Sequence, residues 1–187
     1  EIHGARMVKK ALERLRFSNE VIEKVTHLVR YHMFFYNVGE VSPAGVRRFL
    51  ARIGIEHLDA LMKIREADRI GSGVPKAKPY KIRHLLFMID KVRRDPISPK
   101  MLAVNGDDIM KILTLPPSPK VGWILSALMD EVLEEPSRNK TQDLRLRIKE
   151  LGRLTDKELQ ELAKKGREKI GEAELEAEKE MQEKHRV

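Results

Sequence analysis

The sequence predicts an all-α fold: a multi-helix body, a helix-hairpin-helix-like C-terminal module and a charged tail helix. Apolar residues recur at steps of three and four over most of the chain, the spacing that places them on one face of an α-helix. Nowhere do apolar and polar residues alternate as in a half-buried strand. Aromatic residues make up only 5% of the chain, so we expect a mostly aliphatic core.

The first half of the chain predicts five helices. Ser18 is the expected N-cap of the second, and Ser42-Pro43 opens the third with a cap and a proline at the first helical position. Gly54 is a stop for the third helix, and the sequence "IGSG" ends the fourth. The five apolar stripes are, in order, Met7, Val8, Ala11, Leu12 and Leu15; Ile22, Val25, Leu28, Val29 and Met33; Val46, Phe49, Leu50 and Ile53; Leu58, Leu61, Met62 and Ile64; and Ile82, Leu85, Leu86, Ile89 and Val92.

A proline-containing linker, "RRDPISP", follows the fifth helix. Pro96 and Pro99 both stop helices, so we place a domain boundary after residue 95. The expected domains are 1–95, a helical body; 96–151, a helical module; and 152–187, a charged helical tail.

The module beyond the linker predicts two helices joined by a proline-rich loop. A short helix spans about Asp108–Leu113, and a longer one begins at its cap, Ser118. A helical segment follows at 143–151, and Thr155 opens another helix, in which Glu158 would complete a capping box. The apolar stripe of the longer helix is Val121, Ile124, Leu125, Leu128, Val132 and Leu133.

The charge is concentrated in the first half of the chain. The net charge is +8, and residues 1–95 carry 20 Lys and Arg against 11 Asp and Glu, whereas the remainder carries 17 against 18. A basic half suggests a polyanionic partner, because neutralising phosphates releases counterions. The alternative is an ordinary solvated charged face.

Other compositional features exclude several classes of protein. No cysteine is present, so there is neither a disulfide framework nor a thiolate metal site. Many Glu and Lys residues without Cys are typical of a heat-adapted, thermophile protein. No apolar run is long enough to span a bilayer and no signal-peptide pattern is present, so we expect a cytoplasmic protein with no membrane partner.

Two side chains on neighbouring predicted helices are candidate metal ligands. His32 lies late on the second helix and Asp68 late on the fourth, and imidazole and carboxylate are common ligands. The alternative is a buried His–Asp hydrogen bond or a partly exposed pair, because the sequence offers no clear third and fourth ligand. The other histidines show no ligand spacing. No nucleophile arrangement, glycine-rich phosphate loop or paired-carboxylate centre is found, so the chain taken alone does not resemble an enzyme.

The stretch "LTLPPSPKVG" predicts an anion-binding helix start. A helix entered at Ser118 would present backbone N–H groups and the positive end of its dipole, and Lys120 adds a full charge. Gly122 would let a ligand backbone approach closely. Helix-hairpin-helix modules grip a nucleic-acid backbone in this way, without reading bases. The alternative is a capped helix with a surface lysine.

The region "MLAVNGDDIMKILTLPPSPKVGWILSALMDEVLEEPSRN" resembles the C-terminal part of bacterial class II tRNA nucleotidyltransferases, which include CCA-adding enzymes and poly(A) polymerases. The family pattern has glycine where this chain has Ser118. We expect the serine to stiffen the loop. The residues that match the family pattern are Asn105, Gly106, Asp108, Ile109, Met110, Pro117, Pro119, Val121, Gly122, Leu125, Leu128, Val132, Leu133, Pro136 and Asn139.

The first half is similar to the HD-type helical region of the same enzymes, in the stretches "HGARMVKKALERLRFSNEVIEKVTHLVRYHM" and "GVRRFLARIG…LMKIREADRIGSG". In HD proteins the metal ligands are an early His, a His-Asp doublet, two further histidines and a late Asp. His32 and Asp68 match the last two, and the doublet is absent. The resemblance therefore implies that residues 1–95 form an HD-like domain that is incomplete at its N-terminus, with an incomplete metal site.

The resemblance implies that the catalytic head lies outside this chain, which begins Glu1-Ile2-His3 without an initiator Met. That start also fits removal of a tag or pro-segment. The head would use CTP, ATP and Mg²⁺ to add CCA, or part of it, to tRNA 3′ ends, and this chain would need no cofactor. Its own role would be to hold the acceptor and T arms of tRNA. The expected RNA-binding residues are Lys100, Lys111, Ser118, Lys120, Gly122, Arg138 and Lys140, with Arg47, Arg48 and Arg52 as weaker candidates.

Two alternatives stay open. The chain could be an HD-type metal-dependent phosphohydrolase remnant that uses His32 and Asp68. It could instead be a helical scaffold that docks on a separately encoded catalytic subunit.

Overall fold

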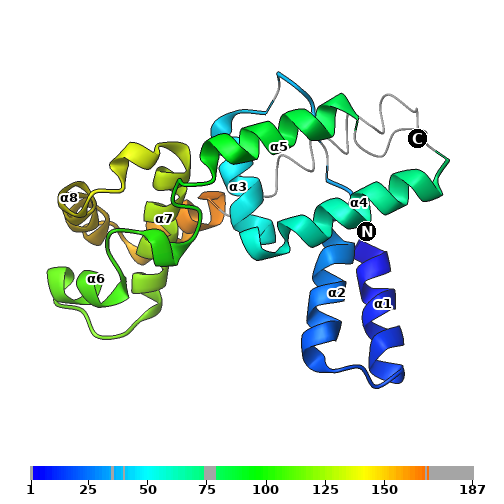
Figure 1. Ribbon diagram of the computed structural model, residues 1–187. Coiled ribbons are helices and arrows are strands. Elements are labelled where there is room, and N and C mark those ends of the chain that lie inside the picture. Colours follow the sequence, from blue (N-terminus) through cyan, green and yellow to red (C-terminus); the bar gives the residue numbers. More distant parts are fainter. Residues whose placement is uncertain (1, 35, 40, 74–78, 167, 169–187) are drawn as a thin grey trace. The chain divides into compact units, whose positions relative to one another are not determined.

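The computed structural model confirms the all-α prediction (Figure 1). It describes residues 2–34, 36–39, 41–73, 79–166 and 168, and within these ranges no strand is present. Residues 156–166 are helical as well, whereas the predicted tail helix beyond residue 168 lies outside the described residues. The helices are α1 (Ile2–Arg14), α2 (Asn19–Tyr31), α3 (Pro43–Ile53), α4 (Leu58–Gly71), α5 (Tyr80–Val92), α6 (Gly106–Leu113), α7 (Pro119–Glu134) and α8 (Thr141–Gly152), with 3-10 turns η1 (Ile55–His57), η2 (Pro99–Met101) and η3 (Pro136–Arg138).

The chain divides into two compact units. The N-terminal unit comprises residues 1–41 and 52–88, and the C-terminal unit comprises residues 42–51 and those from 89 onward. Most of α3 thus belongs to the C-terminal unit although it lies early in the sequence. The domain boundary predicted after residue 95 stays a prediction.

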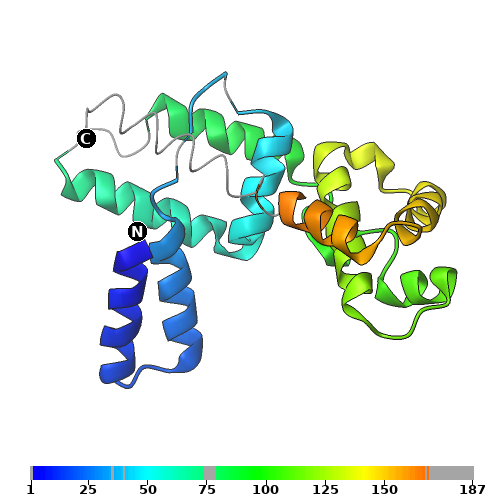
Figure 2. The same cartoon turned by 180° about the vertical axis from the view of Figure 1, so that it is seen from behind.

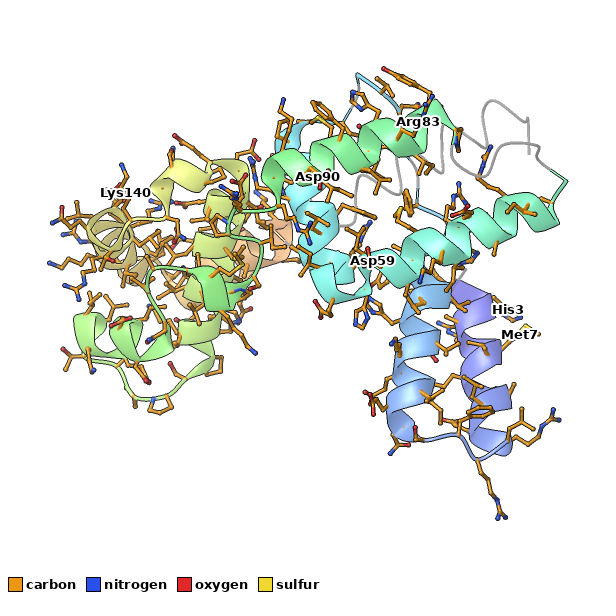
Figure 3. The ribbon with its side chains drawn as sticks, in the orientation of Figure 1. His3, Met7, Asp59, Arg83, Asp90 and Lys140 are labelled. Atoms are coloured by element: carbon orange, nitrogen blue, oxygen red, sulfur yellow. The ribbon has the colours of Figure 1, made fainter. Side chains whose placement is uncertain are left out.

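In the N-terminal unit, α1 and α2 form an antiparallel hairpin, side by side in both views (Figures 1 and 2). Ser18 caps α2 as predicted, and its Oγ accepts a hydrogen bond from the Val21 amide. The predicted stripe of α1 is partly wrong, because Met7 and Leu15 are 60% and 62% exposed. The helix instead buries Ala5, which lies on a different face from Met7, and Figure 3 shows His3 and Met7 projecting away from α2.

In the C-terminal unit, α7 lies in the core. Every residue of its predicted stripe is buried except Leu125, which is half-buried. One continuous aliphatic cluster joins α7 to α6, α8 and the helix at 156–166; its buried members are Leu102, Val104, Ile109, Val121, Ile124, Ala127, Leu128, Met129, Val132, Leu133, Leu144, Ile148, Leu151 and Leu159.

Local capping explains where the helices of this unit begin. The structure starts α6 at Gly106, before the predicted Asp108, because Asn105 and Asp108 form a reciprocal capping box. The predicted box between Thr155 and Glu158 is confirmed. Ser118 occupies the N-cap position of α7 as expected, but its side chain makes no capping hydrogen bond.

Candidate nucleic-acid interface

The predicted helix pair exists as α6, a loop at 114–118 and α7. Thr114 ends α6 in the left-handed conformation, with φ 52°, and the Leu115 amide donates to the carbonyl oxygen of Met110. Pro119 then occupies the first turn of α7, where its missing N–H costs no helical bond. The likeness of this pair to a helix-hairpin-helix module stays an expectation.

Gly122 lies on the exposed side of the first turn of α7. A β-carbon added at this position would meet no heavy atom within 4 Å. The fold therefore does not require a glycine here. The open space above the Gly122 backbone is consistent with close approach of an external group, as the sequence suggested.

Lys120 has a contact that the sequence did not reveal. Its Nζ donates to the carbonyl oxygen of Leu154 at 3.0 Å and lies 3.6 Å from Asp156, and its side chain is 20% exposed. The lysine thus joins the first turn of α7 to the turn after α8. Because the Asp156 carboxylate partly neutralises the charge of Lys120, this lysine would attract a phosphate less strongly than an isolated lysine.

Asn139 links two backbone segments that are distant in the sequence. Each segment carries one of the predicted RNA-binding lysines. The side-chain amide of Asn139 donates to the Met101 carbonyl at 2.9 Å and accepts from the Ala103 amide at 2.8 Å. The exposed residues Lys100 and Lys140 each lie one residue from this junction, and Lys140 also precedes the first turn of α8 (Figure 3). Sequence reasoning matched Asn139 to a family pattern without finding this role.

The remaining two predicted cations differ in their surroundings. Lys111 is exposed on the last turn of α6, where it also interacts favourably with the helix dipole. Arg138 is paired: its Nε donates to Glu135 at 2.6 Å, and Glu131 lies 3.9 Å away. The hydrogen bond from Arg138, with a smaller contribution from the Ser137 hydroxyl, lowers the pKa of Glu135.

The C-terminal half of α7 is rich in carboxylates that are already neutralised by arginines. Arg147 bridges Glu131 and Glu150 at 2.7 Å each, and the hydrogen bond with Glu131 is the main reason that the pKa of Arg147 is raised. Asp130 and Glu134 pair with Arg48. Because arginines already pair with these carboxylates, it is the dipole of α7, positive at its first turn, that makes the N-terminal end of this helix the more favourable one for an anion.

The structure corrects the weaker expectation for Arg47, which is buried. Its guanidinium donates to the carbonyl oxygens of Leu133 and Glu134, at 2.6 and 2.9 Å, and to Asp95 at 2.9 Å. It therefore satisfies the last carbonyls of α7 and is not accessible to RNA. Arg48 is also engaged, with Asp130 and Glu134, and the guanidinium of Arg52 lies 5.5 Å from the ring centroid of Tyr31.

The candidate metal ligands lie on α2 and α4 as predicted. His32 is the C-cap of α2, and its Nδ1 donates to the carbonyl oxygen of Val29 at 2.7 Å, which leaves Nε2 as the nitrogen able to bind a metal. Asp68 lies 3.9 Å from Arg65. Within the described ranges, no group of three or more potential His, Cys, Asp or Glu ligands is found. A metal role for His32 and Asp68 stays a prediction.

The described helices also bear on a membrane role. None of them is both long and apolar enough to cross a bilayer.

The C-terminal unit of this all-helical protein exposes Gly122 on the first turn of α7 and, on other segments, Lys100, Lys111 and Lys140. Comparison with known proteins gives the family. Residues 3–148 match the model of a family described as tRNA nucleotidyltransferase domain 2, putative. The chain belongs to this tRNA nucleotidyltransferase family.

Two curated proteins are similar to the chain. The CC-adding tRNA nucleotidyltransferase of Thermus thermophilus is 32% identical over 131 residues, which cover 70% of this chain and 28% of that protein. The A-adding tRNA nucleotidyltransferase of Deinococcus radiodurans is 28% identical over 131 residues, which cover 68% and 29%. The chain thus spans less than a third of either relative. No solved structure matches it.

Proposed function

We propose that this chain is the tRNA-binding body and tail of a nucleotidyltransferase that adds CCA, or part of it, to tRNA 3′ ends. In this proposal the catalytic head, with Mg²⁺ and CTP or ATP, belongs to polypeptide outside this chain, joined in cis or in trans. Membership of the family and the names of both relatives support tRNA as the ligand.

The observation that carries the proposal is the open first turn of α7. Gly122 is exposed with clear space above its backbone, and α7 offers the positive end of its dipole there. The junction at Asn139 holds Lys100 and Lys140 on exposed segments of the same unit. These groups recognise phosphates and not bases, as expected for a protein that holds many tRNAs by their shape.

Salt dependence tests this mode of binding. If about four phosphates are neutralised, raising the salt from about 50 to about 200 mM should weaken tRNA binding roughly 50- to 150-fold. The measurement is filter binding of the purified chain to deacylated tRNA at both salt concentrations. A flat response to salt would contradict the proposal.

Gly122→Ala separates binding from folding. The added methyl group meets no neighbour, and alanine favours helix over glycine, so the unfolding free energy should rise by about 0.5–1 kcal/mol. The same methyl group should weaken tRNA binding several-fold if a sugar-phosphate backbone lies against this turn. Equal or tighter tRNA binding by the stabilised variant would argue against the assignment.

Charge reversals test a second group of proposed contacts, at the Asn139 junction that follows the C-terminal end of α7. The double variant Lys100→Glu/Lys140→Glu should bind tRNA at least tenfold more weakly and reduce the salt slope by about two, one for each phosphate that is no longer neutralised. Lys165→Glu, at an exposed position on the helix at 156–166, is the matched control. Conversely, Asp156→Asn should strengthen tRNA binding slightly, because the neutral side chain no longer competes with a phosphate for Lys120.

A phosphohydrolase remnant is the second candidate, favoured by the available Nε2 of His32. It predicts metal-dependent release of phosphate from p-nitrophenyl phosphate that His32→Ala abolishes. The third candidate is a scaffold docked on a separate catalytic subunit, which predicts co-purification with a head-like polypeptide.

A further inference from the structure

A row of aromatic rings lies along one face of α5, in the N-terminal unit. The ring centroids of Tyr80 and His84 are 6.0 Å apart, and those of His84 and Phe87 are 6.2 Å apart. Spacings of four and three residues place the three rings on one side of the helix. Tyr80 is 62% exposed and Phe87 is 56% exposed, so both ends of the row face solvent.

Packing from the segment before α3 holds the row in place. The Tyr36 hydroxyl lies 2.6 Å from Nδ1 of His84, and the two ring centroids are 5.9 Å apart. Burial, and to a smaller extent Tyr80, raises the pKa of Tyr36, so its hydroxyl stays protonated at neutral pH. Next to this contact, Lys81 donates to the side-chain oxygen of Asn37. The middle ring is therefore fixed by its neighbours.

Positive charge accompanies the rings. Lys81 and Arg83 are exposed on the part of α5 that belongs to this unit, residues 80–88, which contains no acidic residue. Figure 3 labels Arg83 on this helix. Arg83 precedes Phe87 by one helical turn. This interleaving of cations with exposed rings is the pattern by which proteins bind single-stranded nucleic acids: the rings stack on bases and the cations contact phosphates.

We propose that the α5 row, defined as Tyr80, His84 and Phe87, binds unpaired nucleotides of an RNA by stacking. Cations that surround an apolar patch would favour a protein partner with an acidic rim. On α5 the cations instead lie between the rings along the helix, and this arrangement favours RNA as the occupant. The inference rests on the proposed function, since it requires RNA as the ligand. It adds a contact of a different kind, to bases and not to paired backbone, in the other unit of the chain.

Binding of an unstructured RNA tests the row directly. The probe is a fluorescein-labelled oligoadenylate of about 12 nucleotides, followed by fluorescence polarisation with the full chain. The double variant Tyr80→Ala/Phe87→Ala should bind at least tenfold more weakly, whereas Tyr80→Phe/Phe87→Tyr should bind within about twofold of the parent because it keeps both rings. Ile70→Ala, which removes an exposed apolar side chain from α4 of the same unit, is the matched control and should have no effect.

An abasic oligonucleotide of the same length separates stacking from charge. It keeps the phosphates and lacks the bases, so the two alanine substitutions should leave its affinity unchanged while Arg83→Glu lowers it. Circular dichroism should show the same helix content in every variant, because both rings are at the surface.

The possible outcomes are distinct. Unchanged oligoadenylate affinity in the double alanine variant, or no binding by the parent chain, overturns the proposal. Loss of co-purification with a separate catalytic subunit, with RNA affinity retained, overturns it in favour of a protein docking surface. Salt-dependent binding of tRNA through Gly122, Lys100 and Lys140 is measured separately, so the proposed function can stand where the α5 row fails.

Discussion

The two units of this chain bury apolar surface in different ways. In the C-terminal unit, α6, α7 and α8 share one continuous aliphatic core around fully buried residues such as Ile124 and Leu128. In the α1–α2 hairpin of the N-terminal unit, only Ala5, Ile22 and Leu28 are buried, and α1 leaves Met7 exposed. Buried apolar area is the main source of stability, so the core of the C-terminal unit should be more rigid than the α1–α2 hairpin.

This difference matches the distribution of the candidate RNA contacts. The phosphate contacts we propose need fixed positions, and they lie on the well-packed C-terminal unit. The exposed rings of the α5 row lie on the N-terminal unit. The two kinds of RNA contact that we propose, to the backbone and to unpaired bases, therefore lie on different units.

Truncation in the two regions should give the largest contrast. Leu128→Ala removes a fully buried side chain from the core of the C-terminal unit and should cost about 3–5 kcal/mol. Met7→Ala, at an exposed position on α1, should cost less than about 0.5 kcal/mol. Urea unfolding followed by circular dichroism measures both. Equal costs would abolish the distinction drawn between the core around α7 and the loosely packed helix α1.

Arg47→Ala should have the next largest effect. The substitution leaves Asp95 and the last carbonyls of α7 without their shared partner, which should cost about 3 kcal/mol. Arg47→Lys should recover only part of this, because an ammonium group cannot reproduce the planar donor arrangement. Arg145→Ala, at an exposed position of α8, is the control for loss of charge. If its thermal unfolding midpoint fell as far as that of Arg47→Ala, charge and not geometry would be the cause.

Asn139→Ala should have a smaller effect on stability and a larger one on binding. The substitution removes two hydrogen bonds to the segment at 101–103, at a cost of about 1–2 kcal/mol. The positions of Lys100 and Lys140 are no longer fixed, so tRNA affinity should fall several-fold although neither lysine is changed. Asn139→Asp is the matched variant, since it can still accept from Ala103 but cannot donate to Met101. Unaltered tRNA binding in both variants would separate the junction from the RNA interface.

The smallest effect on stability should come from lowering the pH, which protonates Glu158 in the capping box that it forms with Thr155. Hydrogen bonds from the Thr155 hydroxyl and amide lower the pKa of Glu158 below the ordinary value for a glutamate. A lowered folded-state pKa contributes stability above the unfolded pKa, and this contribution is lost as the pH falls through the folded value. The difference in stability between the parent and Glu158→Ala should therefore be present at neutral pH and shrink below about pH 4.5.

Glu161→Gln serves as the control for this titration, because it removes a carboxylate from the same helix outside the capping box. Urea unfolding at neutral and acidic pH provides the measurement. A constant difference between the parent and Glu158→Ala across this range would mean that the box does not depend on the charge of Glu158.

Prediction from the sequence was most accurate where the cause is local. The caps at Ser18 and Thr155 and the buried stripe of α7 were predicted correctly, because each depends on residues three or four positions apart. The stripe of α1 was partly wrong because Met7, Val8, Ala11, Leu12 and Leu15 span a broad arc of the helix. Only packing against α2 selects which part of that arc is buried.

By itself the sequence determined the all-helical class, most helix ends and the family, since these follow from short-range spacing and motifs. The tertiary structure decided what the basic residues do. Lys120 finds its acceptor 34 residues away at Leu154, and Arg47 finds one 86 residues away at Leu133. Hydrogen bonds of such range depend on how helices pack together, and helical periodicity carries no information about that. The structure therefore assigns Arg47 to the interior and leaves Gly122, Lys100 and Lys140 exposed.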